Sequence, residues 1–308
     1  MKTECPHFLD VKSSELKSKA QSDDPEIKLI VGNGSFLRSS DSKHIKRFYC
    51  RKCGRYFSNA TLNPTFGQKK RRINPALMKL LCSGVSQRRA ARLLGINRKT
   101  VARKLRFLSQ QARLKQREFL KQYEDHPLVS IQWDDLETSE HSKCKPLSVT
   151  LAVEPSERKI LGFQVSQMPA KGHLAKIAIR KYGYRRDERA MGWNVLFKSL
   201  IPIVDPQATF TSDENPHYSK PLLRHFPNAK HVAVKGRRGC IAGQGELKKI
   251  GFDPLFSLNH TCAMLRANLN RLFRRTWCTT KNRQALNDHI ALYVDYHNCV
   301  LTRQRSAA

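Results

Sequence analysis

The sequence predicts a multidomain protein of mixed α+β and α/β class. Three observations support this prediction: a close cysteine pair in a segment poor in apolar residues, a helical apolar period broken at one glycine, and an alternating period from Leu128 onward. We expect a small metal-stabilised domain over residues 1–70, a helical domain over residues 71–122, and a mixed sheet with flanking helices over residues 127–308.

The charge of the chain points to a polyanionic partner. There are 57 Lys and Arg residues against 25 Asp and Glu, a formal net charge of +32 with a pI near 10.2. Such a surplus favours nucleic acid. A membrane partner is disfavoured, because no stretch reaches the roughly 18 consecutive apolar residues of a spanning helix. The N-terminal MKTECPHFLD lacks the apolar core of a signal peptide, so we expect a cytoplasmic location.

The segment YCRKCGRYF is typical of a zinc-ribbon knuckle, with two thiolates on a tight turn between aromatic residues. A complete structural zinc site needs four ligands. The predicted set is Cys5, His7, Cys50 and Cys53. The upstream half is irregular, so His44 is a spare candidate and a ribbon without metal is the alternative. The remaining cysteines are expected to be free thiols.

The segment SQRRAARLLGINRKTVARKLRFL predicts a helix-turn-helix. Gly95 breaks the first helix, Ile96 fills the turn, and Asn97 is a good N-cap for the second helix. That second helix is expected to read the major groove while its basic residues hold phosphates. The expected DNA-contacting residues are Gln87, Arg98, Lys99, Thr100, Arg103 and Lys104. The alternative is an ordinary pair of basic amphipathic helices.

The rest of the chain alternates between strand and helix patterns. Residues 128–135, 146–153 and 158–166 predict a three-stranded antiparallel meander. A helix near 192–204, a strand at 208–213, a helix at 218–226 and a strand at 229–235 follow, which is typical of an α/β unit. After this unit, the sequence predicts two further helices, near residues 259–275 and 283–298.

Acidic residues end two of the predicted strands. Asp134 and Asp135 end the first, and Asp213 ends the fourth. Metal-dependent cleavage of a phosphodiester needs carboxylates that come together from separate elements and hold hard cations through oxygen. The alternative is that these aspartates only cap strands and turns.

The order of these features resembles the ribonuclease-H-like catalytic domain of bacterial insertion-sequence DDE transposases, which a zinc ribbon and a helix-turn-helix precede. TSDENPHYSKPLLRHFPNAKH and RLFRRTWCTTK are the most similar segments. The resemblance implies two Mg²⁺ ions held by Asp134 and Asp213, with Asp134 preferred over Asp135. It also implies sequence-specific binding of double-stranded element ends, strand cleavage and strand transfer to target DNA, and a homodimer or larger assembly on DNA.

The third catalytic position departs from that family's usual glutamate. Alignment with the family places Asn259 there, beside His260, with Arg266 about two helical turns later. An amide oxygen can hold a metal but brings no charge, and imidazole nitrogen suits Mg²⁺ poorly. Glu246 is the carboxylate alternative. A catalytically inactive, transposase-derived DNA-binding regulator is therefore the rival function.

Overall fold

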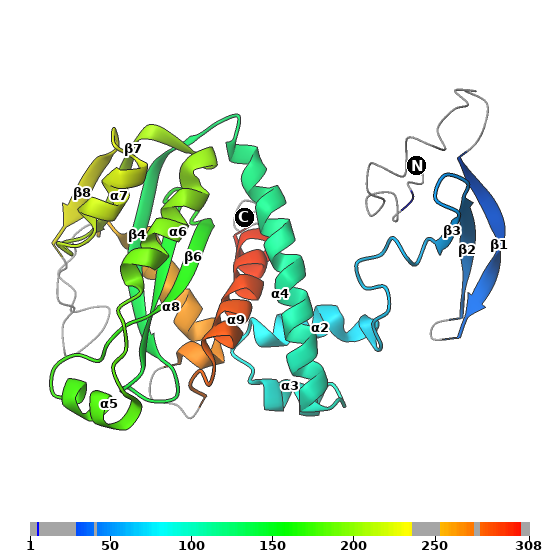
Figure 1. The fold of residues 1–308 in the computed structure, drawn as a ribbon, viewed down its shortest axis with the longest axis horizontal. Coiled ribbons are helices and arrows are strands. Elements are labelled where there is room, and N and C mark those ends of the chain that lie inside the picture. The colour runs from blue at the N-terminus through cyan, green and yellow to red at the C-terminus, as the bar shows by residue number, and fades with distance from the viewer. Residues whose placement is uncertain (1–4, 6–28, 40–41, 236–252, 274–277, 303–308) are drawn as a thin grey trace. The chain divides into compact units, whose positions relative to one another are not determined.

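A computed structural model describes residue 5 and residues 29–39, 42–235, 253–273 and 278–302 (Figure 1). The chain divides into two compact units, Met1–Arg71 and Arg72–Ala308. His7 and Glu246 lie outside the described residues. Within the described ranges, no helix is both long and apolar enough to cross a membrane.

The first unit contains an antiparallel sheet of three strands, β1 (Ile30–Arg38), β2 (Lys43–Cys50) and β3 (Arg55–Ser58), in that order. Gly54 forms the turn between β2 and β3 with a φ of +65°, a region that glycine enters without steric cost. Phe48 and Phe57 stack with their ring centroids 5.4 Å apart. This small sheet buries few apolar side chains, so we expect it to need further stabilisation.

The second unit begins with three helices, α2 (Asn74–Leu81), α3 (Gln87–Leu93) and α4 (Arg98–Leu120). The Asn97 side chain accepts a hydrogen bond from the Lys99 amide at 2.8 Å, which confirms the predicted N-cap. Gly95 has a φ of +59°, as the break between α3 and α4 requires. The predicted pair of helices and the turn between them are therefore present.

These helices do not form a compact unit of their own. Their buried side chains belong to the same hydrophobic cluster as strand residues such as Val149 and helix residues such as Ile290. Helix α4 has 23 residues and lies along α9 (Arg283–Tyr296). Its apolar side continues as far as Ala112, well beyond the turn, and α9 covers it. The expected domain boundary near residues 122–127 is thus not a boundary between compact units.

A mixed sheet of five strands lies at the centre of this unit, in the order β6-β5-β4-β7-β8. Strands β4 (Leu128–Ser139), β5 (Pro146–Val153) and β6 (Ile160–Gln167) form the predicted antiparallel meander. Strands β7 (Val204–Asp213) and β8 (Lys230–Val234) extend the sheet in parallel with β4. The sequence patterns therefore placed all five strands, although β4 is longer than expected.

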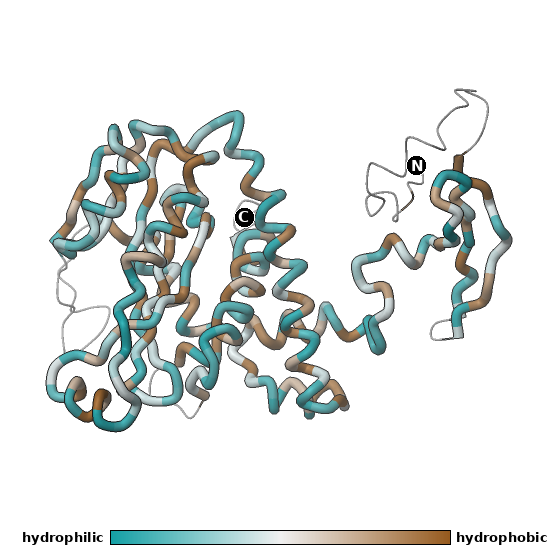
Figure 2. Tube along the Cα trace, in the orientation of Figure 1, coloured by the Kyte–Doolittle hydropathy of each residue, from teal (hydrophilic) through white to brown (hydrophobic). Residues whose placement is uncertain are grey.

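Helices cover both faces of this sheet. On one face, α6 (Arg189–Leu200) and α7 (Ser219–His225) pack around Trp133, Phe197 and Phe210. On the other face lie α4, α8 (Phe256–Asn268) and α9, in the cluster that contains Leu147, Val149 and Leu151. Hydrophobic and hydrophilic residues alternate along the strands and along α4 (Figure 2). Because neighbouring strand residues point to opposite faces, each strand serves both cores.

Two helical segments differ from expectation. Helix α8 ends at Asn268 and does not continue to residue 275, because the chain becomes extended at Leu269 and then makes the 3₁₀ turn Asn270–Leu272. Leu269 and Leu272 are both buried, so the turn serves to bury them. Helix α5 (Leu174–Tyr182) was not predicted, although Leu174, Ile177 and Ala178 have helical spacing. It has nine residues, of which Ala178 is buried.

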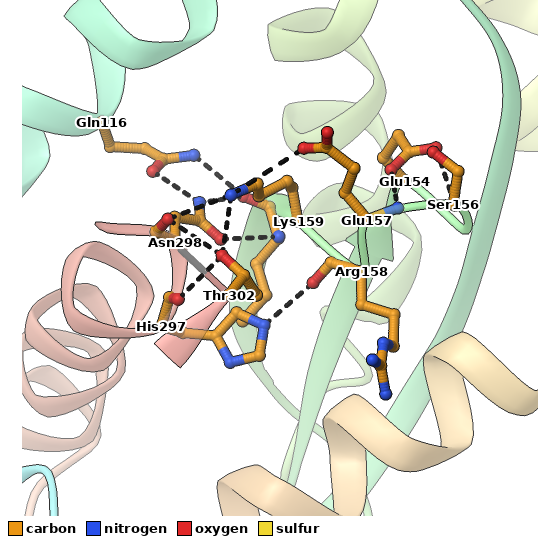
Figure 3. A network of polar contacts seen from close by, with 10 residues as sticks. Gln116, Glu154, Ser156, Glu157, Arg158, Lys159, His297, Asn298 and Thr302 are labelled. Carbon is orange, nitrogen blue, oxygen red and sulfur yellow. Dashed lines mark hydrogen bonds and ion pairs between the residues drawn. The ribbon is translucent and has the colours of Figure 1, made fainter. Parts of the chain in front are cut away.

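A network of polar groups joins α4 to the sheet and to the π-helical turn His297–Leu301 that follows α9 (Figure 3). The Asn298 amide accepts from the Ile160 nitrogen and donates to the Ile160 oxygen, both at 2.9 Å. It also donates to the side chain of Gln116 on α4. Lys159 donates to the Thr302 hydroxyl at 2.7 Å. Asn298 lies in a π-helical turn, His297–Leu301, which aims its side chain at the edge of β6.

Candidate metal sites and nucleic-acid interface

Asp134 and Asp213 lie level with each other on neighbouring strands. Strands β4 and β7 pair in parallel with Gln132 opposite Thr211, so two residues further along each strand the register brings Asp134 to Asp213. Both side chains point to the face that α8 covers. Burial, and then the charge of Asp213, raise the pKa of Asp134 to about 6. The carboxylates of Asp134 and Asp213 are therefore neighbours on the face of the sheet that α8 covers.

The carboxylate of Asp213 is incompletely paired. Its Oδ1 is buried and has no hydrogen-bond partner within the described ranges. Burial, followed by the charge of Asp135, raises the pKa of Asp213, although the Asn215 amide opposes this effect. A buried acceptor without a donor is costly, and a bound cation would remove that cost. The donor set, carboxylate oxygens from two strands, suits Mg²⁺.

Asp134 is oriented by two donors that meet at one of its oxygens. The Tyr218 hydroxyl donates to Oδ1 at 2.8 Å, and the Asp135 amide donates to the same atom at 2.6 Å. Burial and the neighbouring carboxylates raise the pKa of Tyr218, so its hydroxyl keeps the proton that it donates. With Oδ1 engaged, Oδ2 is the oxygen that a cation would take.

Asp135 points to the opposite face of β4, where its carboxylate accepts hydrogen bonds from other elements of the fold. Trp193 Nε1 lies 3.1 Å from each of its carboxylate oxygens, and the Thr150 hydroxyl donates to Oδ1. These bonds tie β4, β5 and α6 together. This arrangement favours Asp134 over Asp135 as a metal ligand. Sequence reasoning missed Tyr218, Trp193 and Thr150, because their role depends on partners 15 to 84 residues away.

The end of β7 is held by a chain of hydrogen bonds. His231 on β8 contacts the hydroxyls of Ser219, at 3.0 Å from Nδ1, and Ser212, at 2.9 Å from Nε2. Ser212 in turn donates to the backbone oxygen of Asp213. Burial lowers the pKa of His231, which keeps the ring neutral. A neutral ring that accepts at Nδ1 and donates at Nε2 satisfies every group in the chain.

Helix α8 begins beside the two aspartates, and Gln132 holds it there. Gln132 donates to the Pro254 oxygen at 2.8 Å and accepts from the Leu258 amide at 3.0 Å. Gln132 is buried and lies two residues before Asp134, on the same face of β4. Nearly two turns into α8, burial and then the charge of Asp134 raise the pKa of Cys262. The first turns of α8 therefore face the carboxylate pair.

The candidates for the third ligand have other contacts. Asn259 is exposed, and its amide nitrogen donates to Asp253 Oδ2 at 2.9 Å. His260 packs on the ring of Phe256 with the centroids 5.8 Å apart. Burial lowers the pKa of His297, the hydrogen bond to the Arg158 backbone opposes this effect, and the charge of His260 lowers the pKa further, so the two rings are neighbours. The structure thus brings together Asp134 and Asp213, and gives Asn259 and His260 other partners.

In the first unit, Cys5, Cys50 and Cys53 form a group that could hold a metal ion. Their sulfur atoms all lie within 4.8 Å of one another, and those of Cys5 and Cys53 are 3.6 Å apart. Burial opposes ionisation of Cys50, but hydrogen bonds from Cys53 and Cys5 outweigh it and lower the pKa of Cys50. The spare candidate His44 lies near the start of β2, whereas Cys50 ends it.

Only some of the residues that were expected to contact DNA are accessible. Arg98, Lys99 and Arg103 are exposed on α4, and Gln87 and Thr100 are half-buried. Lys104 is buried and donates to Asn74 Oδ1 at 2.7 Å, so its expected outward position is wrong. The reason is helical spacing, because Lys104 falls three residues after the core residue Val101.

We expect Arg98→Ala and Lys104→Met to have different effects. Arg98→Ala should weaken DNA binding and relax its sequence preference while leaving thermal stability nearly unchanged. Lys104→Met should lower the free energy of unfolding by roughly 1–3 kcal/mol, because the buried oxygen of Asn74 loses a donor. Thermal unfolding and fluorescence anisotropy on duplex DNA measure the two effects. Loss of DNA affinity without loss of stability in Lys104→Met would contradict this assignment.

No protein-family model matches the sequence, and no curated protein matches it. Among solved structures, the chain is similar to one described as the crystal structure of a pre-cleavage Mos1 transpososome. The sequences are 10% identical, the match covers 78% of this chain and 80% of that chain, and the TM-score is 0.20. A similarity of that size carries no argument about this protein, so a functional proposal has to rest on its own residues.

Proposed function

We propose that the protein is a metal-dependent DNA recombinase of the DDE transposase type. The observation that carries the proposal is the pair Asp134 and Asp213, brought level by the pairing of β4 with β7. One oxygen of Asp213 is buried and has no hydrogen-bond partner among the described residues. The strand order, with an antiparallel meander joined to two parallel strands, is the order expected of a ribonuclease-H-like domain. The net charge of +32 favours a nucleic-acid substrate.

In this proposal Asp134 and Asp213 would hold two Mg²⁺ ions. The ions, when bound, would activate water or a DNA 3′-hydroxyl as the nucleophile and neutralise charge on the phosphate. Tyr218 orients Asp134, and Asp135 fixes β4 through Trp193 and Thr150. The aspartates act as ligands and not as covalent nucleophiles. The exposed basic residues of α4 would position duplex DNA of the element ends, and Cys5, His7, Cys50 and Cys53 would hold one Zn²⁺.

A strand-cleavage assay tests this function. Purified protein is incubated with duplex DNA that carries the native element ends, with Mg²⁺ and with EDTA. Cleavage at the ends that requires Mg²⁺ supports the proposal. Specific binding without cleavage, in either Mg²⁺ or Mn²⁺, supports the rival regulator.

The rival function is a transposase-derived DNA-binding regulator without catalysis. It is favoured by the amide at Asn259 and by its hydrogen bond to Asp253. In the described part of the chain, no third Asp, Glu, His or Cys completes a metal-binding group with Asp134 and Asp213. Asn259→Asp separates the two functions, because a gain of cleavage would place residue 259 at the catalytic centre.

We expect divalent-metal binding to weaken when Asp134 takes up a proton. The pKa of Asp134 is raised to about 6 in the folded protein. Without metal, the contribution of Asp134 to the free energy of unfolding, measured as the difference between wild type and Asp134→Asn, should therefore rise as the pH falls from about 7 to about 4, because the folded state takes up the Asp134 proton first. Apparent metal affinity should fall by up to about tenfold per pH unit below 6.

Thermal unfolding in Ca²⁺ and in EDTA measures this dependence without DNA cleavage. Ca²⁺ should raise the melting temperature at about pH 7.5 and have little effect at about pH 5. Asp134→Asn should abolish the difference between the two pH values. An equal Ca²⁺ effect at both pH values would contradict the assignment of Asp134 as a ligand.

A further inference from the structure

The front of the chain is basic over a long and nearly uninterrupted stretch. From Ile27 to Arg117 the sequence holds one acidic residue, Asp41. This stretch includes all of the sheet β1-β2-β3 as well as the helices α2 and α3. The helix-turn-helix accounts for only part of it. The sheet of the first unit therefore has a strong positive charge for which the proposed function offers no separate role.

The strand register gathers aromatic and basic side chains on one face of this sheet. Tyr49 lies opposite Tyr56, and Phe36 lies opposite Ile45, two residues before Arg47. Because side chains alternate along a strand, Phe36, Arg47, Tyr49 and Tyr56 point to the same side. We call these four residues the aromatic face. Phe48, Phe57 and Cys50 point to the other side, where Phe57 and Cys50 are buried.

The rings of the aromatic face are available for contact. Tyr56 is 63% exposed and Phe36 is 38% exposed. The rings of Tyr49 and Tyr56 lie side by side with their centroids 4.8 Å apart and an interplanar angle of 42°. The Arg47 guanidinium lies over the Phe36 ring, 5.8 Å from its centroid. Two exposed rings, Tyr56 and Phe36, with an arginine on one face of a small sheet are an unusual arrangement for a solvated surface, where large apolar areas are kept small.

We propose that the aromatic face binds single-stranded DNA. Unpaired bases would stack on Tyr56 and Tyr49, and Arg47 with Lys43, which lies on the same side of β2, would hold the phosphates. Charge selects a polyanion, and the rings select one whose bases are exposed, which excludes an intact duplex. This site lies in the first unit and goes beyond the proposed function, because it needs neither Asp134 nor Asp213.

Full-length protein and fluorescein-labelled oligothymidylate test the proposal by fluorescence anisotropy. Tyr56→Leu should weaken binding about 5- to 150-fold, the equivalent of roughly 1–3 kcal/mol for one stacked base. Tyr56→Phe should keep the affinity, because it keeps the ring. Phe66→Leu is the matched control: Phe66 is an aromatic residue of the same unit, 57% exposed, that lies outside the three strands.

Salt dependence separates stacking from charge. Tyr56→Leu should leave the slope of log affinity against log salt unchanged, whereas Arg47→Gln should reduce its magnitude by about 0.7 for each phosphate that the protein no longer neutralises. Binding of duplex end DNA should be the same in wild type and Tyr56→Leu. Unchanged zinc content in each variant shows that the first unit remains folded.

The proposal is overturned if wild-type protein does not bind oligothymidylate. It is also overturned if Tyr56→Leu binds as tightly as wild type, or if Phe66→Leu loses as much affinity as Tyr56→Leu. These outcomes are distinct from failure of the proposed function, since strand cleavage is assayed separately and depends on Asp134 and Asp213. Binding that depends on Tyr56 in a protein without cleavage would support the aromatic face alone.

Discussion

Asp134→Asn and Asp213→Asn are each expected to reduce Mg²⁺-dependent strand cleavage by roughly 10³-fold or more. The amide keeps the shape of the side chain and its acceptor oxygen, but it removes the charge that would hold the ions. Because the two half-buried carboxylates repel each other, losing one charge also removes repulsion. The metal-free variants should therefore be at least as stable as wild type.

Cleavage of labelled end DNA and thermal unfolding in EDTA check this expectation together. Asp205→Asn is the matched control, because Asp205 lies on the same strand β7 as Asp213 but at its opposite end. It should cleave as wild type does. Binding to end DNA should be nearly unchanged in all three variants, because the basic residues of α4 are untouched. Cleavage that survives loss of both Asp134 and Asp213 would exclude the two-metal assignment.

Cys53→Ser is expected to release a structural zinc ion and unfold the first unit. Wild-type protein should contain about one Zn²⁺ per chain, held by Cys5, Cys50, Cys53 and a fourth ligand. Zinc binding contributes about 10–16 kcal/mol to folding in small zinc domains, far more than one thiol contributes by packing. The small apolar core around Phe57 cannot replace that contribution.

Metal analysis and limited proteolysis measure the effect of this substitution. Cys144→Ser is the control, since Cys144 is a half-buried free thiol of the second unit. It should keep both zinc and protease resistance. In Cys53→Ser, cleavage should be confined to residues 1–71, and the second unit should keep its melting temperature. His7→Ala should lower the zinc content if His7 is the fourth ligand. If purified wild-type protein contains no zinc, the assignment of a zinc site to Cys5, Cys50 and Cys53 is wrong.

Much of the architecture was predictable because it depends on local patterns. Apolar alternation placed β4 to β8, and the helical period with Gly95 and Asn97 placed α3 and α4. Asp134 and Asp213 could be singled out because each follows a strand-like sequence pattern, although β4 continues past Asp134 to Ser139 and the expected end of the strand there was wrong. Helix α5 was missed although its apolar residues have helical spacing, because at nine residues it is shorter than the segments that periodicity identifies as helices.

The sequence by itself determined the order of the elements, the basic character of the front and the identity of the two acidic strand residues, because these depend on neighbours along the chain. Only the tertiary structure decided which groups meet. Packing of α4 on α9 merged the helical segment with the sheet and buried Lys104. Pairing of β4 with β7 brought Asp134 to Asp213, and contacts with Trp193 and Thr150 engaged Asp135. Such contacts join residues far apart in sequence, where no local pattern records them.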